Sequence, residues 1–276
     1  MTELVEAAVL GVVQGLTEFL PVSSTGHLIL TEEVLGIDQD ELGLQFDAAI
    51  HLGTLAAVLV YFRGTIVSLV TAWFASLRAR DWAHSLDSKL AWLILIGTVP
   101  AAIAGAVIEG TAEDAFRSPE LVAVMLLLFC IPMVLAERLG KASRVLGSAG
   151  PRDAVLMGAA QSIALIPGVS RSGITISTGM LAGFNREDAA VFTFLLSAPI
   201  IAAAGGKQIV DALRENEAGG AGFEVYAVGL VTAGAVGYAA IAFLLRFLRT
   251  NTVYPFVVYR IVLGVCVLAL AATGVL

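Results

Sequence analysis

Charge is scarce in this sequence. Asp, Glu, Lys and Arg make up 14% of its 276 residues, whereas a soluble domain carries roughly 25%. Hydrophobic residues reach 58%, and the mean hydropathy is +0.89. So few charges cannot solvate a globule of this size, which excludes a soluble protein and predicts an all-α polytopic membrane protein.

Cysteine is almost absent, and the N-terminus has no basic region. The two cysteines, Cys130 and Cys266, both lie within apolar runs, which excludes a disulfide framework or a cysteine metal cluster. Glu3 and Glu6 stand where a signal peptide would be basic, so we expect no cleaved leader. The net charge of −7 indicates no nucleic-acid partner.

Long apolar runs dominate instead. A helix needs about 20 residues to cross the hydrocarbon core of a bilayer. Six runs are close to this length or longer: 44–62, 89–109, 120–137, 187–210, 223–248 and 254–274. Residues 64–77 are less apolar and carry Trp73 with flanking arginines, so we expect them to lie along the membrane interface. The chain is predicted to form one membrane domain, 1–276.

Two further apolar stretches, 4–35 and 153–184, are interrupted by polar residues and proline. Divided at PVSSTG, the first gives helices over 3–19 and 25–35, which reach ~25 Å and ~17 Å at ~1.5 Å per residue. Both are too short to cross the membrane. Each stretch is therefore predicted to form a re-entrant helical hairpin, which is tolerated only against protein or a wet cavity.

The two interrupted stretches are similar to each other. GVVQGLTEFLPVSSTG (11–26) matches GAAQSIALIPGVSRSG (158–173) at a constant offset of 147 places (158 − 11). Each copy is a hairpin followed by three crossings, over about 1–140 and about 150–276. Because three is odd, the second copy is inverted in the membrane. Inverted repeats whose broken helices meet near the midplane are typical of transporters.

Basic residues are concentrated on one side of this topology. That side carries Arg63, Arg78, Arg80, Lys89, Arg138, Lys141, Arg144, Arg152, Arg186, Arg246 and Arg249. The other side has only Arg117, Lys207 and Arg214 among many acidic residues. The basic side is predicted to be cytoplasmic. Both termini and the opening of the first hairpin then face the outside of the cell membrane.

Polar side chains gather at the break of each hairpin. They are Ser23, Ser24 and Thr25 in the first copy, and Ser170, Arg171 and Ser172 in the second. A helix begins at each break, and its free N–H groups and dipole favour an anion. An arginine at this depth costs at least ~2.5 kcal/mol, and its planar fork suits phosphate. The two helix ends are predicted to bind a group with several negative charges, such as a pyrophosphate.

Three more polar residues belong to the first hairpin. Gln14 and Glu18 are four residues apart and share a helical face, and their oxygens beside a phosphate predict a divalent cation, Mg²⁺ or Ca²⁺. His27 follows Ser24 by three residues. Two roles stay open: Ser24 attacks the phosphate with His27 as its base, or His27 attacks directly.

Each of these residues also has a structural interpretation. Glu18 and Arg171 would form an ion pair inside the membrane, the serines would cap a helix, and His27 would be a core residue. We interpret His51 as structural and Arg260 as a buttress of the site. The coincidence of an acid, an arginine, a histidine and hydroxyls at two equivalent breaks favours a functional site.

The motifs resemble those of one family. EFLPVSSTGH (18–27), preceded by QGLTE (14–18), and PGVSRSGITIS (167–177) are similar to the bacitracin-resistance family of undecaprenyl-pyrophosphate phosphatases, and the similarity covers essentially the whole chain. The resemblance implies an integral membrane phosphatase. Its substrate would be a C55 polyprenyl pyrophosphate, and its products the monophosphate carrier lipid of cell-wall synthesis and inorganic phosphate.

The resemblance also assigns residues. The family's acidic motif, its serine and histidine positions and its phosphate-binding stretch fall on Gln14, Glu18, Ser23, Ser24, His27, Ser170, Arg171, Ser172 and Thr175. Many members carry Glu where this chain has Gln14, which weakens the case for a two-carboxylate metal site.

Two functional classes follow, a phosphatase and, from the inverted repeat alone, a transporter or flippase of the polyprenyl phosphate. The expected partners are the prenyl lipid and membrane lipids, and a homodimer is left open.

Overall fold

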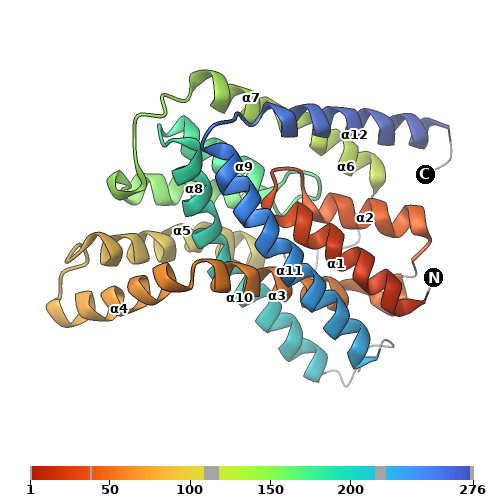
Figure 1. Ribbon diagram of the computed structural model, residues 1–276, viewed down its shortest axis with the longest axis horizontal. Helices are drawn as coiled ribbons and strands as arrows, with labels where there is room; N and C mark the ends of the chain where they lie inside the picture. Colours follow the sequence, from red (N-terminus) through yellow and green to blue (C-terminus); the bar gives the residue numbers. More distant parts are fainter. Residues whose placement is uncertain (1, 38, 109–117, 215–221, 274–276) are drawn as a thin grey trace.

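The computed structural model describes residues 2–37, 39–108, 118–214 and 222–273. Helices form most of this part of the chain (Figure 1). Their order is α1 (Glu3–Phe19), α2 (Ser24–Leu35), α3 (Gln39–Tyr61), α4 (Arg63–Ala79), α5 (Leu86–Ile108), α6 (Pro119–Leu128), α7 (Cys130–Leu139), the short 3-10 helix η1 (Leu146–Ser148), α8 (Pro151–Ile163), α9 (Arg171–Leu181), α10 (Arg186–Arg214), α11 (Phe223–Leu248) and α12 (Tyr254–Ala272).

Within the described residues, five helical segments are long and apolar enough to cross a membrane. They are α5, α6 with α7, α10, α11 and α12. The bent pair of α3 and α4, whose axes meet at 80°, would be a sixth. Large apolar side chains such as Ile103, Val107, Val231 and Val262 point outward, as expected of a surface that faces lipid. The all-α polytopic membrane fold is therefore confirmed.

The first interrupted stretch forms the predicted helix pair. Helix α1 ends where predicted, and α2 begins one residue earlier than predicted. The residue before Pro21 is pushed out of the helical region by the proline ring, and Leu20 accordingly has φ −68° and ψ 143°. Helix α2 then starts after Ser23, whose hydroxyl accepts a hydrogen bond from Gly26 N at 3.4 Å, and ends at Gly36 in the left-handed region.

The second stretch repeats this turn. Ser170 precedes α9 and accepts from Gly173 N at 3.1 Å, just as Ser23 accepts from Gly26. Both serines have positive φ, 79° at Ser23 and 73° at Ser170, a region that costs a non-glycine residue about 1–3 kcal/mol. The same strained conformation 147 places apart (170 − 23) supports the two-copy interpretation, whose boundaries stay a prediction.

One apolar run that was predicted as a single helix is broken. The run over 120–137 is broken at Phe129 between α6 and α7. Pro132, near the start of α7, has no N–H for the carbonyl of Leu128, which explains the break. Helix α4 leaves α3 at an 80° bend, so it does not continue straight on from α3, and its location along the membrane interface stays a prediction.

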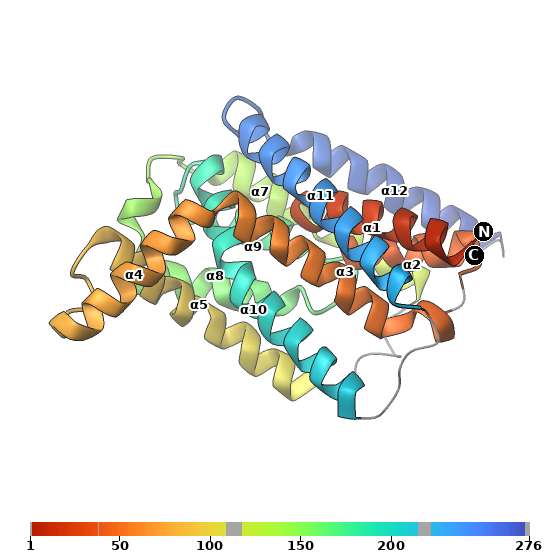
Figure 2. The ribbon, with the colours of Figure 1, turned by 60° about the horizontal axis from the view of Figure 1, so that its bottom comes forward.

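The two halves of the chain interlock. Helix α1 packs along α11 of the second half, and α8 packs along α5 of the first (Figure 2). Gly15 permits the approach of α1, because a Cβ there would lie 2.7 Å from the carbonyl oxygen of Ala233. At the inner end of α1, Phe19 is buried and meets Phe194 of α10 edge to face, with ring centroids 5.3 Å apart. This packing fixes the position of the neighbouring Glu18.

Candidate active site

The two hairpin turns meet at a cavity of ≈ 310 Å³. Helices α3, α5 and α10 complete its walls with residues such as Ala48, Ala101 and Ile201. Six residues predicted for the site line it: Glu18, Ser23, Ser24, Thr25, Ser170 and Arg171. The structure thus brings the polar breaks of both hairpins to one place, as the sequence predicts.

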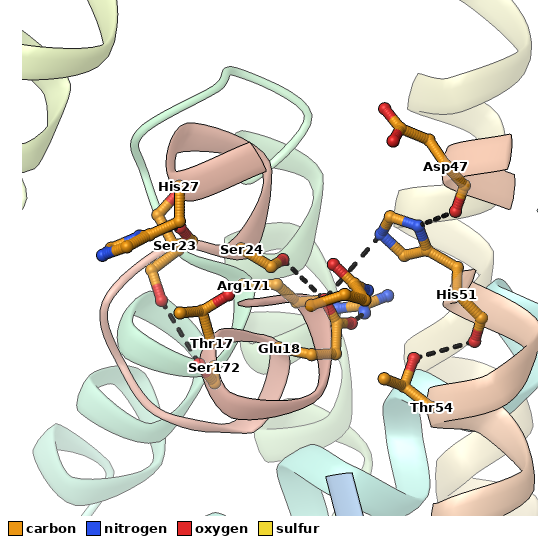
Figure 3. A network of polar contacts seen from close by, with 12 residues as sticks. Thr17, Glu18, Ser23, Ser24, His27, Asp47, His51, Thr54, Arg171 and Ser172 are labelled. Carbon is orange, nitrogen blue, oxygen red and sulfur yellow. Dashed lines mark hydrogen bonds and ion pairs between the residues drawn. The ribbon is translucent and has the colours of Figure 1, made fainter. Parts of the chain in front are cut away.

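Glu18 is the centre of the polar contacts in this cavity. Its carboxylate is buried, and Oε2 accepts hydrogen bonds from Ser24 Oγ at 2.6 Å and from Gln14 Nε2 at 3.2 Å. Oε1 accepts from Nη2 of Arg171 and forms an ion pair with it. Figure 3 shows Ser24 and Arg171 converging on Glu18 from the two hairpins. Three donor groups thus surround this one carboxylate.

The same region ties the two hairpins together. Arg171 on α9 reaches Glu18 on α1, and Ser172 Oγ donates to the carbonyl of Leu20 at 2.9 Å. Ser172 is buried and does not line the cavity, so its observed contact is structural. Thr175 is also buried and does not line the cavity, and among the described residues its hydroxyl has no hydrogen-bond partner.

His27 is not brought into the cavity. Its Nδ1 lies 2.6 Å from the carbonyl oxygen of Ser23, and its Nε2 lies 2.7 Å from the hydroxyl of Tyr259. A carbonyl only accepts, so Nδ1 carries the proton. Nε2 is then engaged by Tyr259, on which the ring also stacks at 5.6 Å. No ring lone pair is left for Ser24, and Figure 3 shows the imidazole on the far side of the turn from Glu18.

The structure places another histidine at the site. His51 of α3, interpreted from the sequence as structural, lines the cavity, and its Nε2 lies 3.8 Å from Glu18 Oε2. Its Nδ1 lies 2.5 Å from the carbonyl oxygen of Asp47, which also lines the cavity. No motif marks these residues, because only the packing of α3 against the hairpins brings them close.

Arg260 buttresses both turns, as predicted. This arginine of α12 is completely buried and donates to four backbone carbonyls. Two of them lie in the hairpin turns, Pro21 O at 3.4 Å and Gly168 O at 2.9 Å. The other two, Met125 O and Leu126 O, lie near the break between α6 and α7. Irregular backbone is thereby satisfied inside the protein, as a membrane requires.

The residues present suit a divalent cation in part. Gln14 Oε1 is buried and has no hydrogen-bond partner among the described residues, while Nε2 of the same amide donates to the carboxylate of Glu18. Among the described residues, no group of three or more His, Cys, Asp and Glu side chains could hold a metal. Mg²⁺ in proteins is usually bound by one or two carboxylates, and phosphate and water supply its other ligands. Glu18 and the amide oxygen of Gln14 would form a minimal ligand set of this kind.

Arg144, in the loop between α7 and α8 and outside the candidate membrane spans, holds the two ends of the second hairpin. It forms a bidentate ion pair with Asp153 at the start of α8, at 2.9 and 2.7 Å, and donates to Ala182 O after α9 at 2.9 Å. The hydrogen bond with Asp153 raises the pKa of Arg144. Burial opposes the ionisation of Asp153, but hydrogen bonds from Arg144 and Gly150 prevail and lower its pKa.

Known proteins resemble this chain over nearly its whole length. The family described as bacitracin resistance protein BacA matches residues 7–266. A Rubrobacter xylanophilus protein named undecaprenyl-diphosphatase is 47% identical over 274 residues, which are 98% of this chain and 99% of that protein. Proteins of the same name from Myxococcus xanthus and a Nocardioides species are 45% and 41% identical, over 98% and 100% of this chain and 90% and 99% of their own lengths. The similarity therefore extends well beyond the two hairpin motifs.

Proposed function

Because the chain belongs to the bacitracin resistance protein BacA family, we propose that it is an undecaprenyl-diphosphatase. It hydrolyses a polyprenyl pyrophosphate in the membrane to the monophosphate carrier lipid and inorganic phosphate. The observation that carries this proposal is the contact of Ser24 Oγ with Glu18 Oε2 at 2.6 Å, beside Arg171. It places a hydroxyl, a base and a guanidinium in one cavity.

Ser24 is the nucleophile in this proposal. Its hydroxyl proton passes to Glu18 as Oγ attacks the terminal phosphorus, because a serine needs an adjacent base. The bond between that phosphorus and the bridging oxygen breaks, and the lipid monophosphate leaves with the electron pair. Water then attacks the phosphoserine, Ser24 Oγ takes its proton back from Glu18, and inorganic phosphate carries the proton that water loses.

Arg171 holds the phosphate in both steps. In the free protein its guanidinium pairs with the carboxylate of Glu18. The phosphoryl oxygens of the substrate are anionic acceptors of the same kind and carry more negative charge. The N-terminus of α9, where Arg171 lies, adds its backbone N–H groups and dipole. These groups are fixed before the substrate arrives, as electrostatic stabilisation of a transition state requires.

A divalent cation is proposed as the cofactor. Glu18 and Gln14 would hold it, and it would neutralise charge on the phosphoryl oxygens.

The substrate's lipid tail has a matching surface. An apolar groove of ≈ 400 Å³ lies along α3, α5 and α10, the same three helices that wall the polar cavity, and it is completed by α4. On α10, Ile201 lines the cavity and Ala202 lines the groove. A polar cavity next to an apolar groove suits an amphiphile whose head is charged and whose tail is a long hydrocarbon.

Phosphate release tests the activity directly. Purified protein in detergent should release inorganic phosphate from undecaprenyl pyrophosphate, and Ser24→Ala should release almost none. A transporter of the lipid would release no phosphate from either protein, which would contradict the proposal.

The nucleophile is tested by trapping the intermediate. Brief incubation with terminally labelled substrate should leave an acid-stable, alkali-labile label, as expected of phosphoserine, and Ser24→Ala should lose it. An acid-labile label that is lost in His27→Ala would instead identify His27 as the nucleophile.

The proposed orientation puts both termini and the opening of the cavity outside the cell. The basic residues of the loops support it, although Glu113, Asp114 and Arg117, which also count in the charge balance, lie outside the described residues. In a protein whose two cysteines are replaced by serine, Thr2→Cys should react with an impermeant thiol reagent added to intact cells, and Lys141→Cys only after lysis. Labelling of both in intact cells would reject the orientation.

A further inference from the structure

The side-chain amide of Gln161 is buried beside the cavity. This residue of α8 is 3% exposed and lines the same cavity as Glu18 and Arg171. Its Nε2 and Oε1 are both buried, and neither has a hydrogen-bond partner among the residues that the structure describes. Leaving a buried amide unpaired costs stability. Such a group next to a cavity is expected to serve whatever the cavity binds.

The first half of the chain shows what an amide at this position does. Gln14 stands 147 places before Gln161 (161 − 14), and its Nε2 donates to Glu18 Oε2 at 3.2 Å. The position equivalent to Glu18 is Leu165 (18 + 147), which also lines the cavity. The second half therefore keeps the donor and replaces its anionic acceptor by an apolar side chain.

We propose that Gln161 Nε2 donates a hydrogen bond to a phosphoryl oxygen of the pyrophosphate. The substrate then supplies to Gln161 the anionic oxygen that Glu18 supplies to Gln14. Ser170 and Arg171 line the same cavity and offer further donors to the same group. This role rests on the proposed function, and it makes Gln161 a substrate-binding residue that affects KM more than kcat.

The test is Gln161→Met, which keeps the length of the side chain and removes both polar atoms. Loss of one hydrogen bond to a charged group should raise KM about tenfold or more. The melting temperature should stay the same or rise, because no partner within the described structure is lost. Gln161→Glu should raise KM further, since it places a negative charge beside the phosphate. Thr193→Val is the matched control: Thr193 is also buried with an unpaired hydroxyl among the described residues, but it does not line the cavity, so KM should not change.

A second measurement is independent of turnover. Inorganic pyrophosphate should raise the melting temperature of the wild type and of Thr193→Val, and raise that of Gln161→Met much less. A folded Gln161→Met protein with wild-type KM would overturn the proposal, and so would a clear fall in its melting temperature, which would make Gln161 structural. If the wild type itself released no phosphate, the proposed function would fail instead.

Discussion

At the scale of single residues, Glu18 is the centre of the proposed mechanism because it contacts residues of both hairpins. Ser24 and Gln14 donate to one of its oxygens, and Arg171 pairs with the other. In the proposed mechanism, the oxygen that accepts the hydrogen bond of Ser24 also accepts its proton. The arginine that neutralises it in the free protein is also the group best suited to hold the substrate's phosphate.

Arg171→Lys should fold and lose most activity. Lysine keeps the charge but cannot present the two parallel N–H groups of a guanidinium, so kcat/KM should fall by roughly 10- to 100-fold. The measurement is phosphate release at matched melting temperature. Near-normal turnover of Arg171→Lys would mean that Arg171 serves only as the ion-pair partner of Glu18.

Gln14→Glu should strengthen the response to a cation. A carboxylate replaces a neutral amide oxygen beside Glu18, so the Mg²⁺ or Ca²⁺ concentration that gives half-maximal activity should fall. With a chelator present, the two adjacent carboxylates should repel and lower the melting temperature, and added cation should restore it. If neither value depends on the cation, the cation does not bind at Gln14 and Glu18.

At the scale of elements, each hairpin depends on groups that hold its turn and its ends. Arg260 satisfies the carbonyls of both turns from α12, and Arg144 closes the loop end of the second hairpin through Asp153 and Ala182. Half-length helices gain little stability on their own. Their position in the membrane therefore rests on these fixed contacts and on packing against α5 and α11.

Arg144→Lys should lower the melting temperature, because the bidentate pair with Asp153 is lost; such bonds contribute about 1–3 kcal/mol. Since the pKa of Asp153 is lowered in the folded protein, its contribution is present above its unfolded pKa of about 3.9 and is lost as the pH falls through the folded pKa. The difference in melting temperature between the wild type and Arg144→Lys should therefore become smaller in acid. Lys141→Met, an exposed cation of the same loop, is the control and should change little at any pH.

At the scale of the whole molecule, the interlocked halves create the cavity and the groove together. Helices α3, α5 and α10 wall both. The polar cavity at the hairpin turns and the apolar groove thus share the same three helices. This arrangement suits the proposed reaction, in which the head group is processed while the tail stays in the membrane.

Ala202→Leu should discriminate between substrates by chain length. The larger side chain narrows the apolar groove, so KM should rise for undecaprenyl pyrophosphate and stay nearly unchanged for farnesyl pyrophosphate, whose tail is short. Ala239→Leu makes the same change at an exposed position on α11 that lines neither the cavity nor the groove, and should affect neither substrate. An equal rise in KM for both substrates in Ala202→Leu would show that the tail does not bind in this groove.

The sequence by itself determined the class of protein and the bounds of the first hairpin. Hydropathy and run length are local properties that fix which segments can enter a bilayer, and Pro21 and Ser23 end one helix and begin the next through their own backbone preferences. The convergence of Glu18 and Arg171 was predictable because a charge inside the membrane needs a partner.

Only the tertiary structure decided which polar side chains share the cavity. His27 lies in the central motif but points to Tyr259, whereas His51, from a helix with no motif, faces Glu18. Gln161 is recognised as a candidate binding residue only because the structure places it in the wall of the cavity. The direction of a side chain depends on its rotamer and on the packing of distant helices, and neither can be read from spacing along the chain.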